Sequence, residues 1–222
     1  MINFIKYLIF ASLLFPGGIV NSHKEKTYTI FSTGNVSGVN TDTAILSQWR
    51  NQAGRMEDFA VLLTGNAIVS QTAQIPGELL LNESHPLLIA PGKAEWAGGS
   101  RQGKDFIKKL IGDLSGKINN PLFFPEEACP GPAEVVLSDH LVVILLDTWW
   151  WVHKYDRRFN KCGIGDRGGI LIQIEDAIRR HYADKHVVVA GYHSLKSYGN
   201  TSGYFSAEQW LGQLPYTFYR KL

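Results

Sequence analysis

Cysteine and charge are the two scarce features of this chain of 222 residues. Its 2 cysteines are too few for a disulfide-stapled scaffold or for a zinc site with four thiolates. Charged residues make up only 19%, and 22 basic against 20 acidic side chains leave a formal net charge of +2. This balance argues against a strongly basic face, so we expect no nucleic-acid partner. The 45% of hydrophobic residues excludes a disordered chain.

The first residues have the pattern of an export signal. Residues 1–6 end in one cation, residues 7–15 are apolar, and small side chains precede a cleavage site after Ser22. We therefore predict a signal peptide at 1–22 and a domain at 23–222 that is periplasmic or secreted, with no transmembrane helix after signal removal. The alternative is an uncleaved anchor. Export permits a disulfide between Cys129 and Cys162, but the sequence does not show whether the two sulfurs meet.

Five apolar runs have the character of strands, and most are continuous rather than alternating, which indicates burial on both faces. They lie at 28–32, 59–63, 86–90, 141–146 and 186–190. Helical spacing of apolar residues lies between them, after a cap at Thr41 or Asp42, at 103–114 and at 170–182. Strands that alternate with helices predict an α/β fold. We expect residues 117–132, which are rich in proline and glycine, to form a long loop.

Four of these strands run directly into a glycine and a polar residue. The segments are Thr33-Gly34-Asn35, Thr64-Gly65-Asn66, Pro91-Gly92-Lys93 and Gly191-Tyr192-His193. In open α/β sheets the carboxyl ends of the strands form the ligand crevice, and glycine there lets a ligand approach the backbone closely. The sequence therefore predicts a crevice at these strand ends.

In the order and context of these segments the chain resembles the calcineurin-like metallophosphoesterases, in particular their secreted acid-phosphatase-like branch. The resemblance covers about residues 27–205, and its most specific parts are Pro91-Gly92-Lys93-Ala94-Glu95-Trp96 and Asp147-Thr148-Trp149-Trp150. It implies an α/β sandwich of two β-sheets flanked by helices, truncated here at the C-terminus. The family also has a helix in the region of 71–84, where this chain shows no helical stripe, so we expect that face to be trimmed.

The family hydrolyses phosphoesters with a pair of divalent metal ions, which activate water and clamp the phosphoryl oxygens. Most of the positions that the resemblance assigns to metal or phosphate ligands carry other residues here. These degenerate positions are Asn35 and Asn66 for aspartates, Lys93 for an asparagine, Ala94 and Tyr192 for histidines. His193 matches the family. Many members also have a histidine at the position of Ser37 and another in the region of 198–203, where this chain has none.

Charge argues against a metal pair in such a site. An asparagine binds a hard cation more weakly than a carboxylate does. Lys93 would add a positive charge, whose repulsion with a dication about 4 Å away is on the order of several kcal/mol. We therefore expect no metal cofactor. If the chain is active, the implied cofactor is a pair of Mn, Fe or Zn ions.

These observations predict an exported homologue that has lost its dinuclear metal site and acts as a binding or scaffold pseudoenzyme. Its partner would be an unknown protein or an anionic ligand. One alternative is an active phosphomonoester hydrolase with an unorthodox metal site, and another is a structural component of an envelope assembly. The candidate substrate-binding residues are Lys93, Tyr192 and His193, and His193 is also the candidate catalytic residue.

Several of these side chains also have a structural interpretation. Lys93 either fills the space left by the metals, beside Asn35, Asn66 or Glu95, or points into solvent. His193 is either a retained acid–base group or a hydrogen-bonded core histidine.

The segment at 147–151 is expected to be mainly structural. We expect Asp147 to accept hydrogen bonds from loop N–H groups. Of Trp149, Trp150 and Trp151, we expect two in the core and one at the surface, with a binding wall as the alternative. Without the family's neighbouring ligands, Glu95 implies packing only.

Overall fold

A computed structural model of the chain describes residues 27–36, 43–68, 81, 84–154 and 162–193. The chain is of the α/β class, as predicted. Its elements, in chain order, are β1 (Thr29–Thr33), α1 (Thr43–Ala53), β2 (Phe59–Thr64), β3 (Leu87–Ala90), η2 (Ala97–Gly99), α2 (Gly103–Ser115), β4 (Leu122–Phe123), η3 (Glu126–Ala128), β5 (Ala133–Ser138), β6 (Leu141–Leu145), α3 (Thr148–Val152), α4 (Arg167–His181) and β7 (His186–Ala190).

The strands form two sheets. The first has the order β1-β2-β3-β4, and all of its neighbours are parallel. The second has the order β5-β6-β7, in which β5 is antiparallel to β6 and β7 is parallel to it. Because β1, β2 and β3 are parallel, the loops that follow them all leave the first sheet at the carboxyl end of its strands.

A continuous apolar core joins the two sheets. Alternate residues of a strand face opposite sides, so Ala60 and Leu62 of β2 face the second sheet while Val61 and Leu63 face away from it. The inter-sheet core consists of Ala60, Leu62, Leu88, Val135, Val143, Leu145 and Ala190. Burial on both faces explains why the sequences of β2, β3 and β6 are continuous apolar runs.

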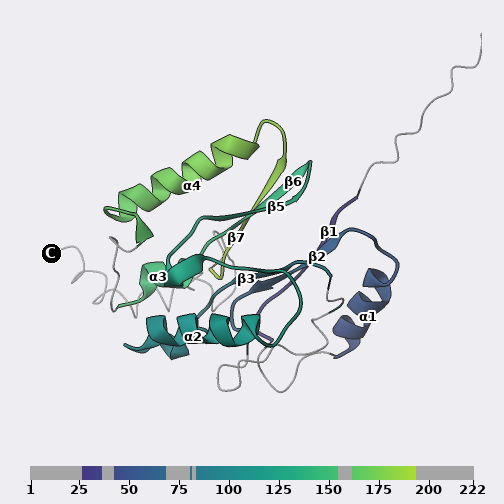
Figure 1. Cartoon of the computed structure of the whole chain (residues 1–222), viewed down its shortest axis with the longest axis horizontal. Coiled ribbons are helices and arrows are strands. Elements are labelled where there is room, and N and C mark those ends of the chain that lie inside the picture. The colour runs from purple at the N-terminus through teal and green to yellow at the C-terminus, as the bar shows by residue number, and fades with distance from the viewer. Residues whose placement is uncertain (1–26, 37–42, 69–80, 82–83, 155–161, 194–222) are drawn as a thin grey trace, which may run out of the picture.

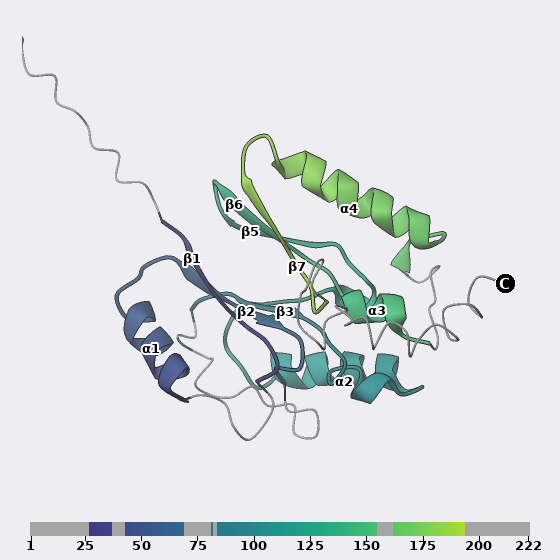
Figure 2. The ribbon, with the colours of Figure 1, turned by 180° about the vertical axis from the view of Figure 1, so that it is seen from behind.

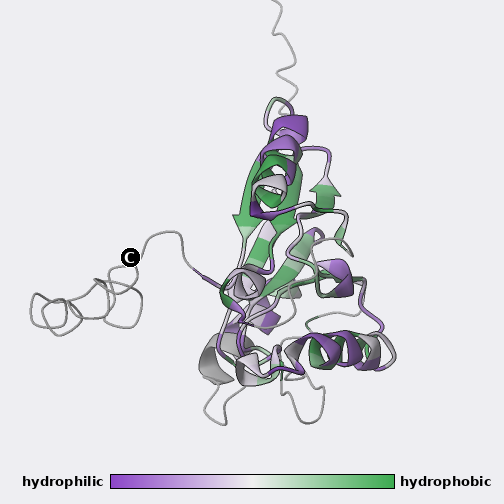
Figure 3. Cartoon of the chain, turned by 90° about the vertical axis from the view of Figure 1, so that its left-hand side faces the viewer, coloured by the Kyte–Doolittle hydropathy of each residue, from purple (hydrophilic) through white to green (hydrophobic). Residues whose placement is uncertain are grey.

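Helices cover the outer faces of the sheets. Leu110 and Leu114 of α2 pack against Val61 and Leu63 on the outer face of the first sheet, and α4 contacts β6 and β7 on the second. Figures 1 and 2 show this layering from both sides, with α4 over β5–β7 and α2 below β2 and β3. In Figure 3 the strands are mainly hydrophobic, whereas the helices carry both hydrophobic and hydrophilic residues.

The loop expected at 117–132 is not continuous. It contains the two-residue strand β4, which extends the first sheet beside β3, and the short helix η3. Strand β5 follows it and was not predicted. The expectation of a trimmed face concerns 71–84, most of which lies outside the described residues.

The inter-sheet core gives a stability prediction. Leu145 is completely buried between the sheets, whereas Leu171 on α4 is 59% exposed. Leu145→Ala should lower the free energy of unfolding by about 2–5 kcal/mol because it leaves a cavity. Leu171→Ala, the matched control, should change it by less than about 0.5 kcal/mol. Urea unfolding measures both, and equal effects would contradict the face-to-face packing of the sheets.

Candidate functional site

The strand-end loops meet in one hydrogen-bonded network. The Asn66 side-chain amide lies within donating distance of Asn35 Oδ1, at 3.4 Å, and of the Tyr192 hydroxyl, at 3.2 Å. The Ala94 N–H donates to Asn66 Oδ1 at 2.8 Å. The structure thus brings together residues that follow β1, β2, β3 and β7, as the sequence predicts. These are four of the five positions to which the family resemblance assigns ligands.

The backbone of this network is unusual at its two asparagines. Asn35 has a φ of 58° and Asn66 a φ of 50°, both in the left-handed region. Asparagine and aspartate both tolerate this region better than other residues with a side chain. The backbone therefore accepts either residue at both positions, and the choice of asparagine concerns charge rather than conformation.

Tyr192 occupies the space between the loops. A β-carbon added to Gly65 would lie 2.1 Å from its ring, and one added to Gly92 would lie 2.6 Å from it. The ring therefore packs directly over two glycines, whose missing side chains make room for it. Its hydroxyl contacts Asn66. Tyr192, which the sequence predicts as a substrate-binding residue, is therefore packed against the loops that form the crevice.

The buried carboxylate of Glu95 holds two of the strand-end loops together. It is only 1% exposed, and its carboxylate accepts hydrogen bonds from four backbone N–H groups. The donors are Asn66 at 2.9 Å, Ala67 at 2.8 Å, Ile68 at 3.1 Å and Gly92 at 2.9 Å. Both carboxylate oxygens are engaged, so Glu95 ties the loop after β2 to the loop after β3. The sequence indicated packing for Glu95 but not this role.

Lys93 and His193 lie at the surface of the site. The sequence left open whether Lys93 fills the space left by the metals or points into solvent, and the structure shows it exposed. Backbone N–H groups, rather than the Lys93 ammonium, surround the Glu95 carboxylate. His193 is not a core residue. Its Nδ1 and backbone N each lie 3.0 Å from the Thr148 hydroxyl oxygen, and its ring stacks on Trp149. Partial burial lowers the pKa of His193, an effect that the contact with Thr148 opposes.

Asp147 is a buried hydrogen-bond acceptor, but its donors are not the loop N–H groups that we expected. It is 1% exposed and accepts hydrogen bonds from the Trp96 indole N–H at 2.8 Å and from the Trp150 backbone N–H at 3.1 Å. The second bond caps the N-terminus of α3. Burial raises the pKa of Asp147 to about 7, helped by the negative charge of Glu95 and opposed by the hydrogen bonds.

The prediction that two of the three tryptophans at 149–151 lie in the core and one at the surface is wrong. Trp150 is buried, but Trp149 and Trp151 are both half-buried. Trp149 packs edge-on against Tyr192 at a centroid distance of 6.0 Å and in parallel with His193 at 5.7 Å. The aromatic rings therefore connect the end of β6 to the end of β7.

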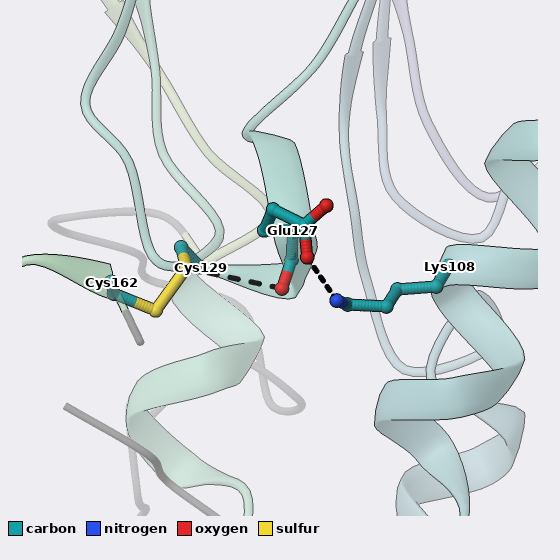
Figure 4. The surroundings of a disulfide bond; sticks show 4 residues. All are labelled: Lys108, Glu127, Cys129 and Cys162. Atoms are coloured by element: carbon teal, nitrogen blue, oxygen red, sulfur yellow. Dashed lines mark hydrogen bonds and ion pairs between the residues drawn. A yellow bond between two sulfur atoms is a disulfide. The ribbon is translucent and has the colours of Figure 1, made fainter. Parts of the chain in front are cut away.

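A disulfide joins Cys129 and Cys162, the pairing that the sequence left open. Figure 4 shows it beside Glu127, which forms an ion pair with Lys108 of α2. Both cysteines line a cleft of about 710 Å³, which also includes Phe123. This cleft shares no lining residue with the strand-end network, so the two sites are separate.

Comparison of the chain with protein-family models, curated proteins and solved structures finds no match. Within the described segments, no cluster of three or more His, Cys, Asp or Glu side chains is arranged to hold a metal ion. No described helix has both the length and the apolar character needed to cross a bilayer.

The raised pKa of Asp147 predicts a pH dependence of stability. Between pH about 4 and about 7, folded Asp147 keeps a proton that the unfolded chain has released. Its contribution to stability should therefore fall as pH rises, by up to about 1.4 kcal/mol per pH unit, and level off above pH about 7. Asp147→Asn should remove this slope, and Asp113→Asn, at an exposed position on α2, should keep it. Unfolding curves from pH 4 to 8 test this, and parallel profiles for wild type and Asp147→Asn would contradict it.

Proposed function

We propose that this chain has the two-sheet sandwich of the calcineurin-like metallophosphoesterases and is an exported pseudoenzyme of that kind. In this proposal it binds a protein partner or an anionic ligand and does not hydrolyse phosphoesters. The layered α/β architecture and the convergence of the strand-end loops support the first part. The contents of the crevice support the second.

The observation that carries the proposal is the position of Tyr192. The resemblance puts a pair of cations between the loops that follow β1, β2, β3 and β7. In this chain the Tyr192 ring packs over Gly65 and Gly92 there, and its hydroxyl contacts Asn66. A phenol is a poor ligand for a hard cation unless it loses its proton, and its ring takes up the volume that a metal and its waters require.

The donor set at this position does not fit a pair of divalent cations. Asn35 and Asn66 carry no charge, and Asn66 Oδ1 already accepts a hydrogen bond from the backbone of Ala94. The nearby carboxylate of Glu95 is engaged by four backbone N–H groups. Nothing in this set offsets the charge of two dications, whose desolvation requires anionic ligands.

The exposed rim supports a binding role. Lys93 and His193 are both exposed beside the network, so a negatively charged group of a ligand or partner could approach them without entering the crevice. The proposal therefore keeps Lys93 and His193 as binding residues and assigns Tyr192 to filling the crevice. A catalytic role for His193 belongs to the alternative of an active hydrolase.

Metal content tests the proposal. We expect protein purified after growth with added Mn, Fe and Zn to carry far less than one equivalent of any of them, and to show no hydrolysis of p-nitrophenyl phosphate above buffer. Elemental analysis and the phosphatase assay measure this. A matched variant, Tyr192→His with Asn35→Asp and Asn66→Asp, restores ligand types at three positions and should bind more metal than wild type. Two tightly held ions in the wild-type chain, with turnover, would overturn the proposal.

A further inference from the structure

Strand β7 ends the second sheet with an edge that no described strand pairs. The His186 N–H donates to His140 O, and Ala190 O accepts from the Leu146 N–H, so both residues turn their peptide groups toward β6. In a parallel ladder the peptide groups of alternate residues point to opposite sides. The peptide groups of Val187 and Val189 therefore point to the open edge.

A cleft of about 440 Å³ lies along this edge, between the two sheets. Its lining includes Leu62, Val188 and Ala190, which belong to the inter-sheet core or pack against it. Ser32 of β1 lines the opposite side. Since β1 pairs only with β2 among the described strands, the cleft is bordered by two strand edges.

The chemistry of the cleft indicates what fits it. Its hydroxyl groups at Thr64 and Thr148 already contact Thr33 O and His193. The remaining lining is mainly apolar, and Val189 beside it is 43% exposed. Apolar side chains match such a surface, and backbone N–H and C=O groups match an unpaired strand edge. A polypeptide segment provides both, whereas a small anion provides neither.

We propose that residues 194–222 of this chain cover the cleft and that part of this segment pairs with the open edge of β7. The segment lies outside the described residues, but it follows His193, which itself lines the cleft. An extended chain advances about 3.3 Å per residue, so the segment can reach every part of the cleft. Its sequence suits an apolar surface, with one acidic residue, Glu208, and with Phe205, Trp210, Leu211 and Phe218 among its side chains.

Hydrogen exchange in the full-length, oxidised chain tests this inference, independently of metal content or activity. The amides of Val187 and Val189 should exchange at least about a hundredfold more slowly in the wild-type chain than in a Trp210→Asp, Phe218→Asp double variant. The amides of Val188 and Ala190, which face β6, should stay protected in both. Phe123→Asp, at a 37% exposed residue of the other cleft, is the matched control and should leave Val187 and Val189 protected.

Three results would overturn the inference. One is rapid exchange of Val187 and Val189 in the wild-type chain. Another is protection that the double variant retains. The third is protection that appears only at concentrations where sedimentation shows a dimer, since the occupant would then be a second copy. Slow exchange in the dilute monomer that the double variant abolishes would support it.

Discussion

The buried carboxylate of Glu95 is the interaction on which the crevice depends. Removing a carboxylate from water costs several kcal/mol unless hydrogen bonds replace its hydration. Here four backbone N–H groups do so, three after β2 and one after β3. Bonds to an ionised acceptor are stronger than neutral ones. They hold the two loops at a fixed separation, and Tyr192 packs against a glycine of each.

In the same arrangement the polar side chains of the crevice form hydrogen bonds with other groups of the chain. Both functional atoms of the Asn66 amide have partners, in Ala94 on one side and in Asn35 and Tyr192 on the other. A metal ion would have to displace these hydrogen bonds and the Tyr192 ring, and would gain only neutral oxygen ligands in return. In this respect hydrogen bonds and aromatic packing take the structural place that the family resemblance assigns to metal ligands. This supports the proposal that the fold is retained for binding.

The sequence predicted features that depend on one strand or one helix turn. Continuous apolar runs marked β2, β3 and β6, and the apolar spacing at 103–114 marked α2. Helix α3, which Asp147 caps, was not predicted. Strand β5 was missed because its apolar run, 135–137, is only three residues long and follows a stretch rich in proline and glycine, and because the alternation of its burial is not visible in the sequence. The role of Glu95 was missed because its partners include backbone groups far along the chain, which leave no side-chain pattern. The sequence marked Tyr192 as a substitution, but the direction of its ring depends on the packing of two sheets.

The sequence of β7 is typical of a central strand, whereas β7 lies at the edge of the described sheet. Edge strands usually protect themselves with charged residues, proline or a covering segment. Residues 187–189 are three consecutive valines, a sequence typical of a strand with neighbours on both sides. The described chain gives β7 one neighbour, β6, and leaves an apolar cleft along its other side. Because an exposed edge of this composition favours aggregation, the proposed covering segment would protect the domain from it, and the apolar residues that follow His193 are the nearest source of one.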